Sequence, residues 1–411
     1  MTEPANISKV IVVGAGPAGL ILALLLSKGN IAVDIYDAGD GLDSAPRATH
    51  YSSPSIHELR RAGIIDDVRA MGFSPDGVTW RDINGKVLAG LSTASLPEQD
   101  KMLCLPLNKL MVIIKEHLDR QANVHIYWGH KVVNLHQDQA QAHIVMQTLE
   151  GEKTASADYI VGCDGANSQI RRSLFGDMAF PGRTWEEQIV ATNVYYDMKP
   201  YGWADANFII DRDNWGMVAK IGTDGLLRIT YGDIPGLTRE ELIARQPMKF
   251  KQFLPGRPDP DKYKVVNISP YKVHQRCAES LRVGRFLLAA DAAHLCNPFG
   301  GLGLTGGLVD VGNLYDCLYG IHRGLADESI LDRYSEVRRQ KYNDIIDPVS
   351  SANIRRLWSD PAKVVEDDEF FHMCATASKD PGFSQKMQLG LNAIMHDFRK
   401  EYRPVGHAVP V

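Results

Sequence analysis

The sequence predicts an α/β protein with α+β insertions and a set of C-terminal helices. Near the N-terminus, β-branched apolar segments alternate with helical segments, as in a parallel sheet covered by helices. Residues 188–273 hold several short strands separated by Gly and Asp turns, which favours a mixed or antiparallel sheet. From Ser329 onward the apolar residues have helical spacing. With 411 residues, the chain is long enough for two or three packed domains.

Composition and charge argue against several functions. The chain has 45 basic and 50 acidic residues, a net charge of −5 and no basic block, which argues against nucleic-acid binding. Its longest apolar run, Leu20–Leu26, is too short to span a bilayer, and neither end has the pattern of a signal peptide or lipidation site. The six cysteines show no CxxC or zinc spacing. We therefore expect a cytoplasmic protein with reduced cysteines, no bound metal, and no nucleic-acid or membrane partner.

The N-terminal segment has the layout of a Rossmann-like, dinucleotide-binding unit. An apolar strand, Lys9–Val13, runs into the motif GAGPAG, followed by a predicted helix over 18–28 and a second strand over 31–36. In such a motif the first glycine makes a tight turn, the second lets a pyrophosphate approach the backbone, and the third lets the helix pack on the strand. These positions are Gly14, Gly16 and Gly19. The second strand ends at Asp37, whose carboxylate suits an unphosphorylated ribose, so FAD or NAD fits better than NADP.

The segment that follows predicts helices, a hairpin and more strands. Asn84-Gly85 marks a β-hairpin over 78–91. Arg47, in an APRA loop, could pair with a phosphate or stay a solvated loop charge, and spacing does not decide between the two. A strand over 159–162 ends in Asp164 and Gly165, before a helix start. We also expect helices over 54–61 and 106–119, and a meander of strands over 124–128, 131–136 and 143–148.

Residues 286–314 carry the strongest signal for a ligand site. A short apolar strand over 286–290 leads to Asp291, and glycines crowd together after Pro298 before a helix over 308–319. The glycines are Gly300, Gly301, Gly303, Gly306 and Gly307. Glycine lets the backbone approach a ligand closely and adopts positive φ without steric penalty. Backbone N–H groups and the helix dipole would hold the oxygens of an electron-rich group here.

The rest of the chain predicts a sheet and a helical end. Strands are expected over 189–197, 207–210, 217–221, 226–231 and 264–268, and helices over 331–342, 351–357, 368–376 and 384–399. A sheet inserted between two dinucleotide-type segments would roof over a cofactor and hold a substrate. His294 is expected to satisfy a hydrogen bond in the core.

Three motifs together resemble the FAD-binding signatures of the group A flavin monooxygenases, the para-hydroxybenzoate hydroxylase-like family. They are GAGPAG, CDGANSQIRR from Cys163 to Arg172, and LAADAAHLCNPFGGLGLTGG from Leu288 to Gly307. The resemblance spans residues from about 9 to 345, since LDRYSEVRRQKY resembles a further segment of the family.

The resemblance implies cofactor roles for individual residues. The pyrophosphate of FAD would bind at Gly14, Gly16, Ala18 and Gly19, its adenosine ribose at Asp37, and its phosphates or flavin edge at Arg47. Asp164 belongs to the DG motif, which would also contact FAD, and Asp291 would bind the ribityl chain. The flavin ring would lie at Pro298, Gly301, Gly303, Leu304 and Thr305. Two positions depart from the family pattern. Ala290 stands where glycine is usual, and Asn108 stands where Gln or Arg is usual, which puts its flavin contact in doubt.

The resemblance also implies a reaction. NAD(P)H would reduce FAD, and O2 would then oxidise a phenolic or other aromatic small molecule through a flavin hydroperoxide. Candidates to hold or deprotonate the phenol are Tyr195, Arg228, Tyr231 and His274. Alternatives with the same fold are epoxidation, Baeyer–Villiger-type insertion, oxidative decarboxylation or halogenation, although the halogenase motif WxWxIP is absent. A flavin-binding protein without turnover is a further alternative.

The implied domain organisation is discontinuous. Residues 1–75, 100–180 and 276–345 would form the Rossmann-like FAD domain, 76–99 and 181–275 the substrate-binding β-sheet domain, and 346–411 a C-terminal helical segment. The protein would act as a monomer or a homodimer.

Overall fold

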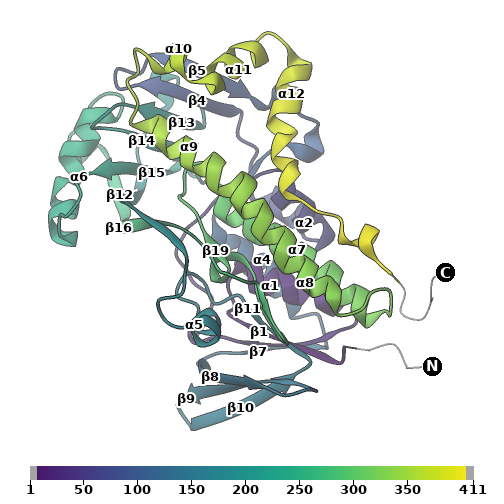
Figure 1. Ribbon diagram of the computed structural model, residues 1–411. Coiled ribbons are helices and arrows are strands. Elements are labelled where there is room, and N and C mark those ends of the chain that lie inside the picture. The colour runs from purple at the N-terminus through teal and green to yellow at the C-terminus, as the bar shows by residue number, and fades with distance from the viewer. Residues whose placement is uncertain (1–6, 404–411) are drawn as a thin grey trace.

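A computed structural model describes residues 7–403 of the chain. The described part is a mixed α/β structure with sheets of eight, six, three and two strands and several long helices (Figure 1). The expectation that neither end carries a targeting pattern, and the outer ends of the predicted ranges 1–75 and 346–411, concern residues 1–6 and 404–411, which lie outside the described residues.

The six-stranded sheet contains the N-terminal unit. Its strand order is β17 (Arg282–Val283), β18 (Phe286–Leu288), β11 (Tyr159–Gly162), β1 (Lys9–Val13), β2 (Ala32–Tyr36) and β7 (Val124–Tyr127). All neighbours except β17 and β18 pair in parallel. The helices α1 (Pro17–Lys28), α4 (Leu107–Leu118) and α7 (Leu302–His322) pack with the sheet in the largest apolar core. Strands buried in this way read as continuous apolar runs, which is why the sequence located them.

The predicted meander is wrong in one strand. β7 does not pair with the two strands that follow it in the sequence but pairs in parallel with β2. The three-stranded sheet consists instead of β8 (Lys131–Gln137), β9 (Ala142–Thr148) and β10 (Gly151–Ala157), and it projects at the bottom of the molecule in Figure 1. β10 was missed because GEKTASA is polar and only its last residue is buried.

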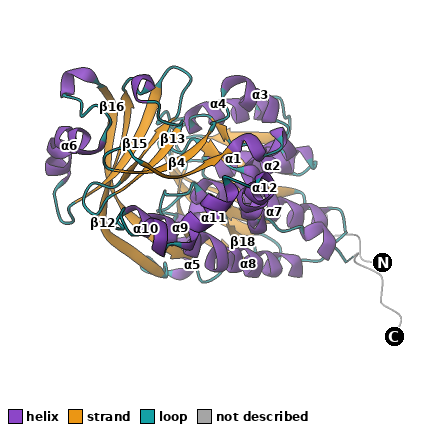
Figure 2. Cartoon of the chain, turned by 90° about the horizontal axis from the view of Figure 1, so that it is seen from above, coloured by secondary structure: helices purple, strands orange, loops and turns teal. Residues whose placement is uncertain are grey.

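The eight-stranded sheet forms the other half of the structure. Its order is β19 (His294–Leu295), β16 (Lys264–Cys277), β12 (Gly182–Tyr195), β15 (Leu226–Asp233), β14 (Gly216–Lys220), β13 (Ala206–Ile210), β4 (Gly77–Asp82) and β5 (Val87–Ser92). The predicted mixed sheet is confirmed, because β13 and β4 are parallel while the other neighbours are antiparallel. Figure 2 shows these strands side by side, with α1, α2 and α7 gathered at one end.

The sequence missed a helix beside this sheet. α6 (Arg239–Phe253) begins with a capping box between Thr238 and Glu241 and contains Pro247. Its Leu242, Phe250 and Phe253 pack against one face of the sheet in an apolar core. This packing closes that face of the sheet to a ligand.

The helical segments of the last third are longer and more broken than expected. α8 (Ser329–Lys341), a π-helical turn (Tyr342–Ile346) and α9 (Asp347–Leu357) form one continuous rod, which runs diagonally across Figure 1. The predicted helix over 384–399 is correct only in its first part: α12 (Pro381–Leu389) ends at Leu389, and short 3-10 turns follow at Gly390–Ile394 and Phe398–Glu401. The remaining elements are α2 (Ser53–Arg61), α3 (Ile65–Met71), α5 (Gln169–Phe175), α10 (Val364–Asp367), α11 (Glu369–Ala377), β3 (His50–Tyr51), β6 (Leu103–Cys104) and 3-10 turns at Thr93–Ser95, Glu98–Asp100, Lys199–Tyr201, Pro260–Lys262 and Ala290–Ala292.

Within residues 7–403, none of the helices has both the length and the apolar character needed to cross a membrane. The same residues contain no cluster of three or more side chains suited to holding a metal ion. All six cysteines are free thiols, and four of them are buried, as predicted.

Candidate active site

Four parallel strands bring the three sequence motifs to one edge of the six-stranded sheet. Gly14 directly follows β1 and Asp37 directly follows β2, while Asp164 lies two residues after β11 and Asp291 three residues after β18. Backbone hydrogen bonds hold these ends together: the N–H of Gly14 donates to the carbonyl of Tyr36 at 2.8 Å, and the N–H of Cys163 donates to that of Val13 at 2.8 Å. Ligands of open α/β sheets bind at the carboxyl ends of the strands, so this edge is the expected cofactor site.

The three glycines of the first motif differ in what surrounds them. A Cβ at Gly14 would lie 2.5 Å from the carbonyl oxygen of Cys163, and a Cβ at Gly19 would lie 2.0 Å from the carbonyl oxygen of Gly14. Gly16, which caps α1, faces open space, with no atom within 4 Å of such a Cβ. Gly14 and Gly19 are therefore required by chain packing, whereas Gly16 leaves room for a ligand at the helix N-terminus, beside the buried Ala18.

Two of the strand-end carboxylates are held by backbone groups. Asp37 accepts hydrogen bonds from the N–H of Ala15 at 2.6 Å and of Gly39 at 2.7 Å, one on each oxygen. Asp164 uses Oδ2 to accept from the N–H groups of Gln169 and Ile170, at 2.7 and 3.1 Å. Its Oδ1 is buried without a partner, and burial raises the pKa of the Asp164 carboxyl group. Buried polar atoms in folded proteins are normally hydrogen-bonded, so this oxygen is a candidate contact for a bound ligand.

Asp291 remains accessible to solvent although protein surrounds it. Desolvation raises the pKa of its carboxyl group, while the charges of His294 and Arg47 oppose that rise. The predicted strand over 286–290 is too long, because β18 ends at Leu288 and a 3-10 turn begins at Ala290. Ala290 has φ of +57°, a left-handed conformation that favours glycine, which explains why the family resemblance implies glycine at this position.

A buried ion-pair network supports this turn. Asp310 of α7 accepts hydrogen bonds from the N–H of Ala290 at 3.0 Å and from Nε2 of His294 at 2.7 Å. Arg338 of α8 donates from Nε to the other carboxylate oxygen at 2.6 Å. The expectation that His294 satisfies a core hydrogen bond is confirmed, and the network fixes the backbone that carries Asp291.

The glycine-rich segment enters α7 earlier than the sequence predicted. The helix begins at Leu302 rather than Leu308, so Gly303, Gly306 and Gly307 lie within it. Gly301, with φ of +66°, is its N-cap, and Thr305 donates from Oγ1 to the carbonyl of Gly301 at 2.9 Å. Gly303 and Leu304 are half-buried in the first turn. Pro298, also half-buried, precedes this turn, so the helix N-terminus and its unpaired N–H groups lie beside it.

Arg47 and Asn108 border the same region. Arg47 forms an exposed ion pair with Asp43 at 2.8 Å, and its charge acts on Asp291. Asn108, at the second position of α4, has a buried Oδ1 without a partner. The unpaired oxygens of Asn108 and Asp164, together with the open space at Gly16, fit a large polar ligand such as FAD along this edge.

Arg228 is the candidate substrate residue that faces this site. It donates from Nε to Oδ1 of Asn193 at 2.7 Å, and from Nη2 to the carbonyl oxygens of Pro46 and Arg47, the latter at 2.9 Å. The loop that holds Arg47 is thus tied to β12 and β15 of the eight-stranded sheet. Burial lowers the pKa of Arg228, which marks it as a poorly solvated cation.

The other three candidates lie at different places on the eight-stranded sheet. Tyr231 is fully buried on the opposite face of the sheet, against Phe250 and Phe253 of α6, so it cannot contact a ligand beside Arg228. The Nδ1 atom of His274 lies 2.9 Å from Oγ1 of Thr184. Tyr195 lies at the exposed end of β12, where its hydroxyl donates to Asp224 at 2.9 Å. Successive strand residues face opposite sides, and the sequence did not reveal which side holds the site.

Sequence reasoning missed three residues in this region. His50 has a buried Nε2 without a partner, and burial together with the charge of Arg228 lowers its pKa to about 4. Burial raises the pKa of Tyr271 to about 12, and the nearby charge of Arg228 opposes that rise. Gln275 reaches Asn297, the residue before Pro298. None of the three lies in a motif, so no sequence signal distinguished them.

Comparisons with known proteins agree with this geometry. Residues 8–349 match the family model described as an FAD binding domain. The chain is 38% identical over 371 residues to the para-nitrophenol 4-monooxygenase of Pseudomonas sp. (strain WBC-3). This alignment spans 89% of this chain and 92% of that protein. It is 34% identical over 353 residues to the 6-hydroxy-3-succinoylpyridine 3-monooxygenase HspB of Pseudomonas putida (strain DSM 28022 / S16), spanning 85% and 89% of the two chains.

Solved structures give the same relationship. The p-nitrophenol 4-monooxygenase PnpA of Pseudomonas putida DLL-E4 superposes with a TM-score of 0.89 at 36% identity, covering 95% of this chain and 98% of that one. The flavin-dependent monooxygenase PieE in complex with FAD and substrate superposes with a TM-score of 0.78 at 21% identity, covering 98% and 77%, and shares the fold.

Proposed function

The chain belongs to the FAD binding domain family and to its group A flavin monooxygenases, and on that premise we propose that its substrate is a phenol with a substituent opposite the hydroxyl. The enzyme is an FAD-dependent monooxygenase of the aromatic hydroxylase type, with NAD(P)H as reductant. Bound FAD supplies the oxidation of NAD(P)H and the transfer of oxygen, while the protein binds, orients and shields the substrate.

The names of two relatives support the substituted phenol. Para-nitrophenol 4-monooxygenase is named for the ring carbon that carries the nitro group, and 6-hydroxy-3-succinoylpyridine 3-monooxygenase for the carbon that carries the succinoyl group. In both names that carbon lies opposite a hydroxyl group. We propose the same ring position for the substrate of this chain.

The observation that carries the proposal is the placement of Arg228. A poorly solvated guanidinium on the site face of the sheet attracts an anion, and a phenolate oxygen is the anion that a phenol provides. Loss of the phenol proton raises the electron density of the ring carbon opposite the oxygen, which is the carbon to be oxidised. We propose that His50 accepts that proton, because its lowered pKa keeps the ring neutral and its Nε2 has no other partner. Tyr195 stays a proposed contact at the rim of the site.

The cofactor assignments of individual residues are part of the proposal. We propose that Gly16, Ala18 and Asp37 contact the adenosine and pyrophosphate part of FAD, that Asp291 contacts the ribityl chain, and that the first turn of α7 contacts the flavin. The open space at Gly16 and the unpaired oxygens of Asn108 and Asp164 support this placement.

We also propose a division of labour between the two large sheets. The six-stranded sheet with α1 and α7 would hold FAD, the eight-stranded sheet would hold the aromatic substrate, and residues 346–411 would form the C-terminal helical segment. The free cysteines support a reducing compartment, so we propose a cytoplasmic enzyme that acts with O2 as a monomer or homodimer. Size-exclusion chromatography with light scattering distinguishes the two oligomeric states.

The test is NADH or NADPH oxidation by the FAD-loaded protein with para-nitrophenol and other para-substituted phenols. Oxygen added at the nitro-bearing carbon expels nitrite, so we expect stimulated oxidation and about one nitrite per NAD(P)H in the first turnover. Arg228→Met should weaken the response by about tenfold or more, whereas Arg245→Met, which removes an arginine paired with Asp233 beside α6, should not. Stimulation by alkenes or ketones but by none of the phenols would overturn the proposal.

A further inference from the structure

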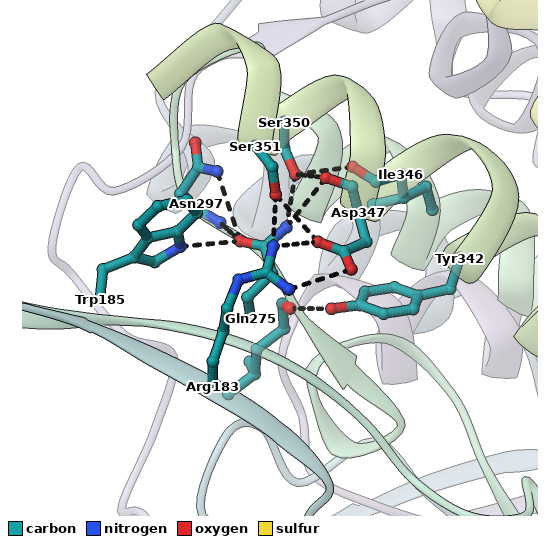
Figure 3. A network of polar contacts seen from close by, with 10 residues as sticks. Arg183, Trp185, Gln275, Asn297, Tyr342, Ile346, Asp347, Ser350 and Ser351 are labelled. Atoms are coloured by element: carbon teal, nitrogen blue, oxygen red, sulfur yellow. Dashed lines mark hydrogen bonds and ion pairs between the residues drawn. The ribbon is translucent and has the colours of Figure 1, made fainter. Parts of the chain in front are cut away.

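Gln275 joins three parts of the chain that lie far apart in sequence (Figure 3). It lies on β16 and is 1% exposed. Its side chain contacts β12, the loop before Pro298, and the rod formed by α8 and α9. A buried amide is favourable only when both ends are paired, so its partners define what it does.

Both ends of the Gln275 amide are fully paired. Its Oε1 accepts hydrogen bonds from the backbone N–H of Asn297 at 3.1 Å, from Nδ2 of Asn297 at 3.3 Å, and from Nε1 of Trp185 at 3.3 Å. Its Nε2 donates to Oγ of Ser350 at 2.6 Å and to the carbonyl of Asp347 at 3.4 Å. Gln275 therefore connects the loop before Pro298 to α9.

The loop is also held at its other end. Asn297 accepts from the N–H of Phe299 at 3.0 Å, and Asn353 of α9 donates to the carbonyl of Phe299 at 3.2 Å. A Cβ at Gly300 would lie 2.6 Å from Nδ2 of Asn353, so the loop packs directly on α9. Pro298 is thus fixed between two side-chain contacts, Gln275 before it and Asn353 after it.

Further hydrogen bonds surround the contacts of Gln275. Arg183 of β12 donates to Asp347 at 2.7 Å and to Ser351 at 2.6 Å, and Tyr342 donates to the carbonyl of Leu295 at 2.8 Å. The π-helical turn Tyr342–Ile346 lies where the rod meets this network, and Ser350 donates to the carbonyl of Ile346 at 2.6 Å. Single π-turns inside long helices occur frequently at functional sites.

We propose that Gln275 is a positioning residue that sets the place of the Pro298 loop relative to the substrate face of the eight-stranded sheet. The proposal rests on the proposed function, because that face is where the phenol would bind. Without Gln275 the loop loses the tie to α9 on the Asn297 side of Pro298 and keeps only the Asn353 contact after it, so the substrate no longer lies at a productive distance from the flavin. NAD(P)H, a proton and O2 then yield NAD(P)+ and hydrogen peroxide, and no oxygen reaches the substrate.

The first experiment compares Gln275→Leu with Gln246→Leu. Gln246 is a matched control, since it is equally an amide in the buried part of the sheet domain, donates to Tyr263 at 3.2 Å, and belongs to α6 on the opposite face. In Gln275→Leu we expect the product formed per NAD(P)H to fall by about tenfold, with peroxide making up the difference and FAD still bound. Gln246→Leu should form as much product per NAD(P)H as the wild type does. Equal coupling in both variants would overturn the proposal.

A second variant covers the case in which Gln275→Leu does not fold. In Gln275→Glu the ionised carboxylate keeps the three acceptor contacts but faces the carbonyl of Asp347 without a proton to donate. A protonated carboxyl group can donate as the amide does, so coupling should recover as the pH falls, in this variant but not in the wild type. Coupling that is unchanged by pH in Gln275→Glu contradicts the proposal.

A readout independent of the reaction separates this inference from the proposed function. Hydrogen exchange of the amides of residues 296–301 should accelerate in the Gln275 variants and stay unchanged in Gln246→Leu. If the wild type converts no phenol, the proposed function fails, and the exchange of this segment still decides whether Gln275 positions the loop.

Discussion

Arg338 and Asp310 form an ion pair that is closed to solvent: Nε of Arg338 lies 2.6 Å from Oδ1 of Asp310, and both side chains are 0% exposed. Asp310 uses its second oxygen for His294 and for the backbone of Ala290. The pair therefore couples α8 to the turn that carries Asp291. Arg338 also donates to Asn313 of α7 and to the carbonyl of Ile394, so the guanidinium joins α8, α7 and the turn at Ile394.

Removing the cation should be strongly destabilising. Arg338→Met leaves the Asp310 carboxylate buried with one partner fewer, and we expect the free energy of unfolding to fall by about 3–5 kcal/mol. Arg333→Met on the same helix is the control, because Arg333 is 41% exposed in its pair with Glu336 and should change stability by less than about 1 kcal/mol. Urea unfolding followed by tryptophan fluorescence measures both. Similar losses in the two variants would contradict the role given to Arg338.

The same pair predicts a loss of stability in acid. His294 and Arg338 offset the desolvation of Asp310 and lower its pKa to about 2. The folded-state pKa of Asp310 lies below the unfolded value of about 4. The ionised carboxylate therefore stabilises the folded protein fully above about pH 4, and this stabilisation is lost as the pH falls towards about 2. Asp310→Asn should be less stable at neutral pH and should lack this part of the acid dependence. The comparison requires unfolding free energies of both proteins across that interval.

Glu58 predicts the opposite dependence on pH. It is 2% exposed, and burial raises its pKa to about 7, although Arg61 lies 2.9 Å away and opposes the rise. Its folded-state pKa lies above the unfolded value, so the wild type should lose up to about 3 kcal/mol of stability as the pH rises from about 4.5 to about 7. Glu58→Gln keeps an acceptor for Arg61 and does not titrate. A wild type and variant with parallel stability curves over that range would exclude the raised pKa.

Ala290→Gly should stabilise the protein. An alanine in the left-handed conformation is strained by about 1–2 kcal/mol, and glycine removes that strain at a smaller entropic expense. We expect the free energy of unfolding to rise by about 1 kcal/mol and the melting temperature to rise with it. The control is Ala289→Gly, whose φ of −144° is extended, so that glycine there should only destabilise.

Gly14 and Gly16 should respond differently to alanine. Gly14→Ala would place Cβ 2.5 Å from the backbone of Cys163 at φ of +105°, so it should destabilise the protein even without cofactor, by about 2 kcal/mol or more. Gly16→Ala meets no protein atom and should leave the stability of the FAD-free protein unchanged. It fills space proposed for the pyrophosphate, so FAD affinity should fall by about tenfold or more. Fluorescence titration with FAD, alongside thermal unfolding of the FAD-free proteins, separates the two effects.

Several elements were readable in the sequence because their signals are local. The strand, glycine turn, helix and acid from Lys9 to Asp37 are consecutive, and parallel pairing then brings Asp37, Asp164 and Asp291 to one sheet edge without further information. The Asn84-Gly85 turn likewise specified its own hairpin. Where the local pattern was ambiguous, the prediction was wrong. The polar α6 contains a proline and was not recognised, and the helix after Gly301 begins six residues earlier than its apolar pattern suggested.

The sequence by itself determined the sheet edge at which we propose that FAD binds, because each of its motifs combines a strand, a turn and a polar residue within a few positions. Only the tertiary structure showed which face of the eight-stranded sheet α6 covers, and the uncovered face is the one we propose for the substrate. Arg228 and Tyr231 lie three residues apart on one strand and hence on opposite faces, and the packing of α6 determines which face is closed. The partners of Gln275 lie 22 to 90 residues away, so its role depends on contacts that no local pattern encodes. Motifs specify backbone conformation within a segment, whereas the face that binds substrate is set by how segments pack.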